Sequence, residues 1–192
     1  MAPLLVVAAL VAAGCADDGR TLSTPTRPAP STTIADTAAT AASAVPRIGS
    51  AAGAIVLSST AFLDGGVIPL QYTCDGTEIS PPLLWTGVPP DAGELAISMI
   101  DSDAGGFVHW LVAELPPELR SVGEGALPEG VVERPNSRGT PGWTGPCPPK
   151  GPAHHYVFTL YALPADCNAT DVASVEACAS ATGTFTALYQ RP

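Results

Sequence analysis

Positive charge is scarce in this sequence. Its 192 residues include 8 Lys and Arg against 18 Asp and Glu, which gives a net charge of −10 and a pI near 4.4. Proteins that bind nucleic acid neutralise phosphates with clustered basic side chains, and a surface this acidic opposes that interaction. We therefore expect no nucleic-acid partner.

Apolar runs long enough to span a bilayer are lacking as well. Residues 4–13 are all apolar, but a spanning helix needs about 20 such residues. The run has the length of the apolar part of a signal peptide, which we predict over residues 1–14. The string from Leu10 to Cys15 resembles a bacterial lipobox, in which Cys15 becomes the first mature residue and carries a lipid. No Lys or Arg precedes Leu4, and an ordinary secretory peptide with Cys15 as a bystander is the alternative.

Residues 16–53 are rich in Ala, Thr, Ser and Pro and show no hydrophobic period. Such a composition buries too little apolar surface to offset the entropy of the chain. We predict that residues 15–53 are a lipidated, disordered tether. It would hold a folded domain of residues 54–192 at the outer face of the cell membrane.

Four cysteines follow the tether, and their even number in an exported chain favours two disulfides. Four cysteines allow three pairings, of which we favour Cys74–Cys147 and Cys167–Cys178, the second of which closes a short loop. Free thiols packed as small apolar side chains are the alternative.

The domain is predicted to be mainly β, because short apolar runs alternate with Gly and Pro from residue 54 onward. Residues 93–101, 107–115 and 154–163 are nearly continuous apolar runs, which are typical of strands covered on both faces.

The other segments are less regular. Opening strands are expected in residues 54–63 and 65–74, whereas residues 80–90 contain too many prolines for a central strand and are expected to form a structured loop. Residues 170–180 are the best candidate for a helix, and residues 184–189 fit either the end of a helix or a last strand.

Candidate binding residues are concentrated between residues 101 and 161, which contain all three histidines. Asp101 and Asp103 have the same parity at the end of a predicted strand, so an extended backbone would point both carboxylates the same way. His109 lies within an apolar strand, where a buried imidazole needs a polar partner such as an aspartate. Taken singly, such a histidine is more often a core residue, and an Asp-x-Asp pair is more often a turn.

A second group of candidates lies near residue 155. His154 and Tyr156 share one face of a predicted strand, and the preceding Gly- and Pro-rich loop would let backbone N–H groups approach a ligand. Imidazoles, a phenol and backbone amides together could bind a phosphate or a carboxylate.

Several motifs together resemble the phosphatidylethanolamine-binding or Raf-kinase-inhibitor-like family in its bacterial branch. They are YTCDGTEISPPLLWTGVP, the Asp-x-Asp-Ala run, FVHW, GPCPPKG and the His-x-Tyr before an apolar strand, in family order over residues 54–189. The resemblance implies sheets packed as a sandwich-like core with a few short peripheral helices, and a small pocket for phosphate-like anions. The matching ligand-binding positions are Asp101, Asp103, His109, Gly145, Pro148, His154 and Tyr156.

Two departures from the family pattern affect this carry-over. Ser102 and Gly105 replace two prolines, which loosens the loop that positions Asp103, and His155 replaces an arginine between the His and the Tyr. By alternation His155 should point away from the pocket.

The resemblance and the residues together favour binding without turnover, with no cofactor or metal. His109 and His154 would donate hydrogen bonds to the anion, most strongly when protonated, and phosphate affinity would rise as the pH falls through about 6.5. The alternatives are a metal-dependent hydrolase that uses Asp101, Asp103, His109 and His154, and an inhibitor or interaction module that acts on an unidentified protein partner through its surface. A serine hydrolase is not supported, because no G-x-S-x-G occurs.

Overall fold

A computed structural model of the chain describes residues 54–192. The predicted signal peptide, the lipidation site at Cys15 and the tether lie outside the described residues. In the described part, no helix has the length and apolar character needed to cross a membrane.

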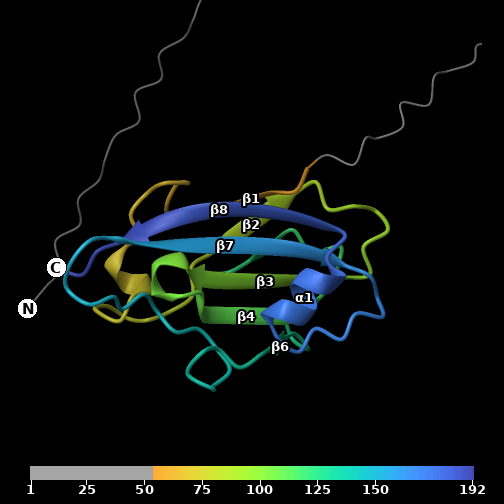
Figure 1. Ribbon diagram of the computed structural model, residues 1–192. Coiled ribbons are helices and arrows are strands. Elements are labelled where there is room, and N and C mark those ends of the chain that lie inside the picture. Colours follow the sequence, from red (N-terminus) through yellow and green to blue (C-terminus); the bar gives the residue numbers. More distant parts are fainter. Residues whose placement is uncertain (1–53) are drawn as a thin grey trace, which may run out of the picture. The chain divides into compact units, whose positions relative to one another are not determined.

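Two antiparallel sheets form the fold (Figure 1). The larger has the strand order β6-β4-β3-β7-β8, and the smaller has the order β1-β2-β5. The strands are β1 (Val56–Ser59), β2 (Leu83–Thr86), β3 (Glu94–Asp101), β4 (Phe107–Leu115), β5 (Ser121–Val122), β6 (Val132–Glu133), β7 (His154–Leu163) and β8 (Ala181–Tyr189). Helix α1 (Val172–Cys178) and the 3-10 turns η1 (Leu70–Tyr72) and η2 (Ser102–Ala104) complete the described elements, which confirms a mainly β sandwich-like fold.

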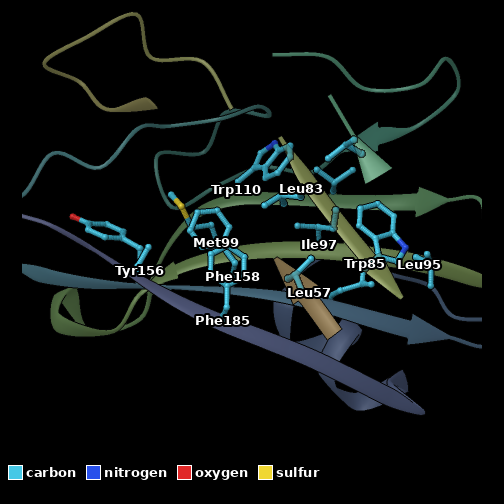
Figure 2. Close-up of a cluster of buried hydrophobic side chains, with 14 of the residues drawn as sticks. Leu57, Leu83, Trp85, Leu95, Ile97, Met99, Trp110, Tyr156, Phe158 and Phe185 are labelled. Atoms are coloured by element: carbon cyan, nitrogen blue, oxygen red, sulfur yellow. The ribbon is translucent and has the colours of Figure 1, made fainter. Parts of the chain in front are cut away.

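The main core lies between the two sheets. Leu57 and Trp85 from the smaller sheet face Ile97, Met99 and Phe158 from the larger one, and all are buried (Figure 2). The opposite face of the larger sheet packs against α1 through Val175. The central strands are therefore covered on both faces, which explains why their sequences are apolar without alternation.

Three expectations for the elements need correction or completion. Residues 65–74 do not form a strand, because Pro69 stands at the start of η1 and only an isolated bridge joins Val67 to Leu188. Residues 80–90 are not a loop throughout, since β2 occupies their middle and the prolines flank it. Residues 184–189 belong to β8.

The helix in residues 170–180 is confirmed over a shorter span, with Asp171 as its N-cap.

Both favoured disulfides are present. Cys74 is bonded to Cys147 and Cys167 to Cys178. The first joins the segment after η1 to the loop before β7, and the second holds α1 to the loop that precedes it.

Candidate anion-binding site

Asp101 is the centre of the candidate site. It ends β3, where its register partners are Phe107 on β4 and Tyr156 on β7. Its side chain is buried, and its Oδ1 accepts hydrogen bonds from the backbone N–H groups of Asp103 and Ala104 at 2.9 and 3.1 Å. These bonds cap η2 and leave Oδ2 for other partners.

His154 is oriented by this carboxylate. Its Nδ1 lies 2.8 Å from Oδ2 of Asp101, and because a carboxylate only accepts, Nδ1 donates. Nε2 of His154 therefore remains for a ligand. The bond joins β3 and β7 across 53 residues of sequence.

His109 reaches the same place because β4 contains a bulge. The register passes from Met99–Trp110 to Ile100–Val108, so His109 is the extra residue on β4. A bulge re-aims a side chain, and the imidazole lies 5.3 Å from the ring of Tyr156 (centroid to centroid). The sequence contained no turn residue in this strand that could have predicted the bulge.

The tautomer of His109 follows from its hydrogen bond. Nδ1 lies 2.8 Å from the backbone oxygen of Thr144, which can only accept, so Nδ1 carries a proton. Nε2 is then the free nitrogen, and it lies 4.0 Å from Oδ2 of Asp101. Burial lowers the pKa of His109 below its usual value, and the charges of Arg138 and His154 act in the same direction. The bond to Thr144 and the charge of Asp101 oppose this shift.

Tyr156 lies beneath these groups rather than in the cavity wall. The residue is fully buried, and its hydroxyl has no partner at good hydrogen-bond distance and angle within the described residues, although Asp101 lies near enough to act on it as a weak acceptor. Figure 2 shows the ring at the end of the core cluster, with the hydroxyl directed away from it. Burial raises the pKa of Tyr156 strongly, and the charge of Asp101 adds to the effect. The phenol is therefore neutral and able to donate.

A cavity of about 180 Å³ lies against Asp101, His109 and His154. The sequence pattern did not predict that Ala104, Phe107, Arg138, Cys147 and Pro149 would be part of its wall. The lining residues are Asp101, Ala104, Phe107, His109, Arg138, Cys147, Pro148, Pro149 and His154.

Three predicted site residues lie outside the cavity: Tyr156, Asp103 and Gly145. Asp103 was expected to point the same way as Asp101, but the 3-10 turn breaks strand parity at this point. Its Oδ2 instead accepts from the backbone N–H and from Nδ1 of His155 at 2.6 and 2.8 Å, on the exposed rim. These bonds lower the pKa of Asp103.

Gly145 does not contact the cavity either. Its N–H donates to Glu78, and a Cβ at this position would lie 2.9 Å from the backbone of Tyr72 and of Thr73. The glycine is thus needed for the close approach of two loops.

A second hollow, of about 440 Å³, lies at the opposite end of β3. Glu94, Glu114 and Arg134 line it, and a salt bridge of 2.7 Å joins the last two. With two carboxylates and one guanidinium, this hollow is poorly suited to an anion. The cavity at Asp101 has the better chemistry although it is smaller.

Comparisons with known proteins identify relatives of this chain. The chain is 47% identical over 112 residues to UPF0098 protein Rv1910c of Mycobacterium tuberculosis, a match that covers 58% of this chain and 55% of that protein. It is 45% identical over 117 residues to LppC of the same species, which is named provisionally as a lipoprotein, with 59% and 58% covered. The matches thus span little more than half of these relatives.

Solved structures show the same fold. The crystal structure of YbcL from Escherichia coli, described as a member of the mammalian PEBP family, superposes with a TM-score of 0.65 at 28% identity and covers 72% of this chain and 99% of YbcL. CT736 from Chlamydia trachomatis gives a TM-score of 0.63 at 31% identity with the same coverage. The family model of the phosphatidylethanolamine-binding proteins matches residues 58–189, and the chain belongs to this family.

Proposed function

We propose that the cavity at Asp101 binds a small anionic group, such as a phosphate or a phospholipid headgroup, without turnover. The observation that carries the proposal is the orientation of the two imidazoles. His109 and His154 each use Nδ1 for a bond within the protein and keep Nε2 for a ligand. Arg138 adds a positive charge to the wall.

Proton placement decides how an anion fits beside Asp101. Its carboxylate repels an oxyanion, so binding needs a proton between them. The proton can sit on Nε2 of a histidine, which then donates to the ligand, or on a ligand oxygen that donates to Asp101. Both arrangements predict stronger binding at lower pH.

The absence of turnover is inferred from the groups that line the cavity. Cys147 is held in a disulfide and is not free as a thiolate. Both oxygens of Asp101 already accept hydrogen bonds. No lining residue has the pairing of a hydroxyl or thiol with a base that activates a nucleophile.

The metal-dependent alternative loses one of its four proposed ligands, because Asp103 is turned toward His155. In residues 54–192 no group of three or more His, Cys, Asp or Glu side chains has the geometry to hold a metal ion. Metal analysis of the purified protein, before and after chelation, tests this alternative directly.

Calorimetry with glycerophosphoethanolamine tests the proposed function. This phosphodiester keeps one negative charge over the range in which histidine titrates, unlike a phosphomonoester with a pKa near 6. His154→Gln should weaken binding about tenfold or more, since a charge-assisted hydrogen bond contributes about 1.5–3 kcal/mol. His155→Gln is the matched control, because His155 belongs to the same strand but points to the rim. Equal affinities for the two variants would contradict the proposal.

We further infer that the protein is exported and tethered to the outer face of the membrane by a lipid on Cys15. The lipobox-like string and the similarity to LppC support this. Mass spectrometry of the intact protein from its native membrane should show acyl chains on Cys15. A mature chain without acyl groups would contradict the inference that a lipid on Cys15 tethers the protein to the membrane.

An interaction module is the second candidate, because large apolar side chains are exposed on one segment. Leu63 and Val67 are 79% and 69% exposed, and Leu70 is also exposed. If partner binding survives His109→Ala while anion binding is lost, the surface rather than the cavity carries that function.

A further inference from the structure

One wall of the cavity is a proline-rich segment that is covalently anchored at one point. Cys147, Pro148 and Pro149 line the cavity, and Cys147 is bonded to Cys74, which lies 73 residues earlier. Proline has no N–H to donate, so each proline removes one possible attachment of the backbone. The prolines of this segment are Pro146, Pro148, Pro149 and Pro152.

Hydrogen bonds anchor the two sides of Cys147 unequally. Before it, the loop is held by Trp143 Nε1 donating to the Tyr72 oxygen and by Cys74 N–H donating to the Pro146 oxygen, both at 3.2 Å. After it, residues 147–153 make a single hydrogen bond to the rest of the described chain, from Gln190 Nε2 to the Gly151 oxygen at 2.8 Å. The disulfide is therefore the main attachment of the cavity wall.

Neither cysteine of the bond is fully buried. Cys74 and Cys147 are both partly exposed, and exchange requires that a thiolate reaches one of their sulfurs. Cys167 and Cys178 form the other disulfide, which contributes nothing to the cavity wall. The chain thus contains one disulfide at the cavity and one distant from it.

We propose that the Cys74–Cys147 disulfide is a site of thiol–disulfide exchange, through which a dithiol loosens the cavity wall and weakens anion binding. One thiolate of the dithiol attacks a cysteine sulfur and forms a mixed disulfide, and the other cysteine leaves as a thiolate that takes a proton. The second thiol of the dithiol then displaces the remaining cysteine. The dithiol ends as a disulfide, and two electrons and two protons have passed to the protein.

The effect on affinity rests on the proposed function and follows from preorganisation. In the oxidised protein the wall is already in its binding position, whereas in the reduced protein ligand binding must order residues 147–153. Ordering a few side chains costs enough to lower affinity about tenfold.

Two double variants of the full-length protein isolate the bond. Cys167→Ser with Cys178→Ser keeps the cavity disulfide alone, and Cys74→Ser with Cys147→Ser keeps the distant one alone. Each is measured oxidised and after dithiothreitol. The first readout needs no ligand: the rate of tryptic cleavage after Lys150, which lies exposed in the segment, relative to cleavage after Arg138. The second is the affinity for glycerophosphoethanolamine.

Reduction should accelerate cleavage after Lys150 and lower affinity about tenfold in the variant that keeps the cavity disulfide, and should change neither in the other. Unchanged cleavage and affinity, with reduction verified by alkylation and mass spectrometry, overturns the proposal. Faster cleavage with unchanged affinity would show that reduction loosens the wall but does not weaken anion binding, and would overturn that part of the proposal. An oxidised protein that binds no phosphodiester contradicts the proposed function itself, which is a separate failure.

Discussion

At the scale of single residues, the unpaired hydroxyl of Tyr156 is the feature that most needs a reason. A buried hydroxyl without a partner costs free energy, so native proteins rarely keep one. The ring packs against His109 and the core, and that packing does not require the oxygen.

Tyr156→Phe should therefore raise the stability of the unliganded protein by about 1 kcal/mol, because it removes a desolvated group that has no partner. The same variant should leave phosphodiester binding nearly unchanged, because Tyr156 does not line the cavity. Urea unfolding and calorimetry measure the two effects. A loss of stability would show that the hydroxyl has a partner within the protein.

The lowered pKa of His109 gives stability a pH dependence of known sign. Below about pH 6.5 the unfolded chain protonates this imidazole before the folded protein does, so the unfolded state binds more protons. The free energy of unfolding of the unliganded protein should therefore fall as the pH drops toward the folded-state pKa, by at most about 1.4 kcal/mol per pH unit. Asp101, His154, Arg138 and Tyr156 surround the ring and set the extent.

Phosphodiester affinity should change in the opposite direction over the same range, because protonated Nε2 donates to the anion. For His109 this rise begins below the ordinary histidine value, because burial lowers its pKa in the unliganded protein. Urea unfolding and calorimetry at several pH values, with His109→Gln as the control, measure both trends. If His109→Gln shows the same pH dependence of stability and affinity, other titrating groups cause it.

At the scale of elements, the strands that are buried on both faces were the ones predicted best from the sequence. Residues 93–101, 107–115 and 154–163 are apolar without alternation, and β3, β4 and β7 occupy them almost completely. The short strand β2 was missed because flanking prolines suggested a loop, although Leu83 and Trp85 alternate with exposed neighbours. The pocket histidines were placed on the correct strands.

The site residues that were predicted wrongly are positioned by turns and long-range contacts, which the hydrophobic periodicity of the sequence does not reveal. Asp103 lies within the 3-10 turn η2, which ends strand parity. Gly145 is fixed by the approach of a loop that lies about 70 residues earlier in the chain. The bulge that brings His109 into the site is likewise set by the pairing of β4 with β3.

The contact between the two sheets depends on a glycine in β8. A Cβ on Gly183 would lie 2.5 Å from both Cγ2 and the backbone oxygen of Ile55, next to β1. Gly183→Ala should lower the free energy of unfolding by about 1–3 kcal/mol, since the strands must move apart. Thr184→Ala, at the exposed neighbouring position, is the control. Similar small losses for both variants would show that the sheets can adjust.

At the scale of the whole molecule, the two disulfides constrain the unfolded chain to different degrees. The Cys74–Cys147 bond spans 73 residues and the Cys167–Cys178 bond spans 11. In the chain-entropy model they stabilise the fold by about 4 and about 3 kcal/mol, respectively. Urea unfolding of the two Cys→Ser double variants should rank them in this order. The reverse order would mean that strain or residual structure outweighs loop length.

If the cavity binds an anion as proposed, the hydrogen bond between Asp101 and His154 also determines when the protein can hold it. Its two partners come from strands that are adjacent in the sheet but 53 residues apart in the chain, and His109 arrives on the other side of β3. A polypeptide that is threaded through a membrane as an extended chain has none of these neighbours. If the protein is exported as proposed, it would cross the membrane without its ligand and could bind one only after it has folded on the other side.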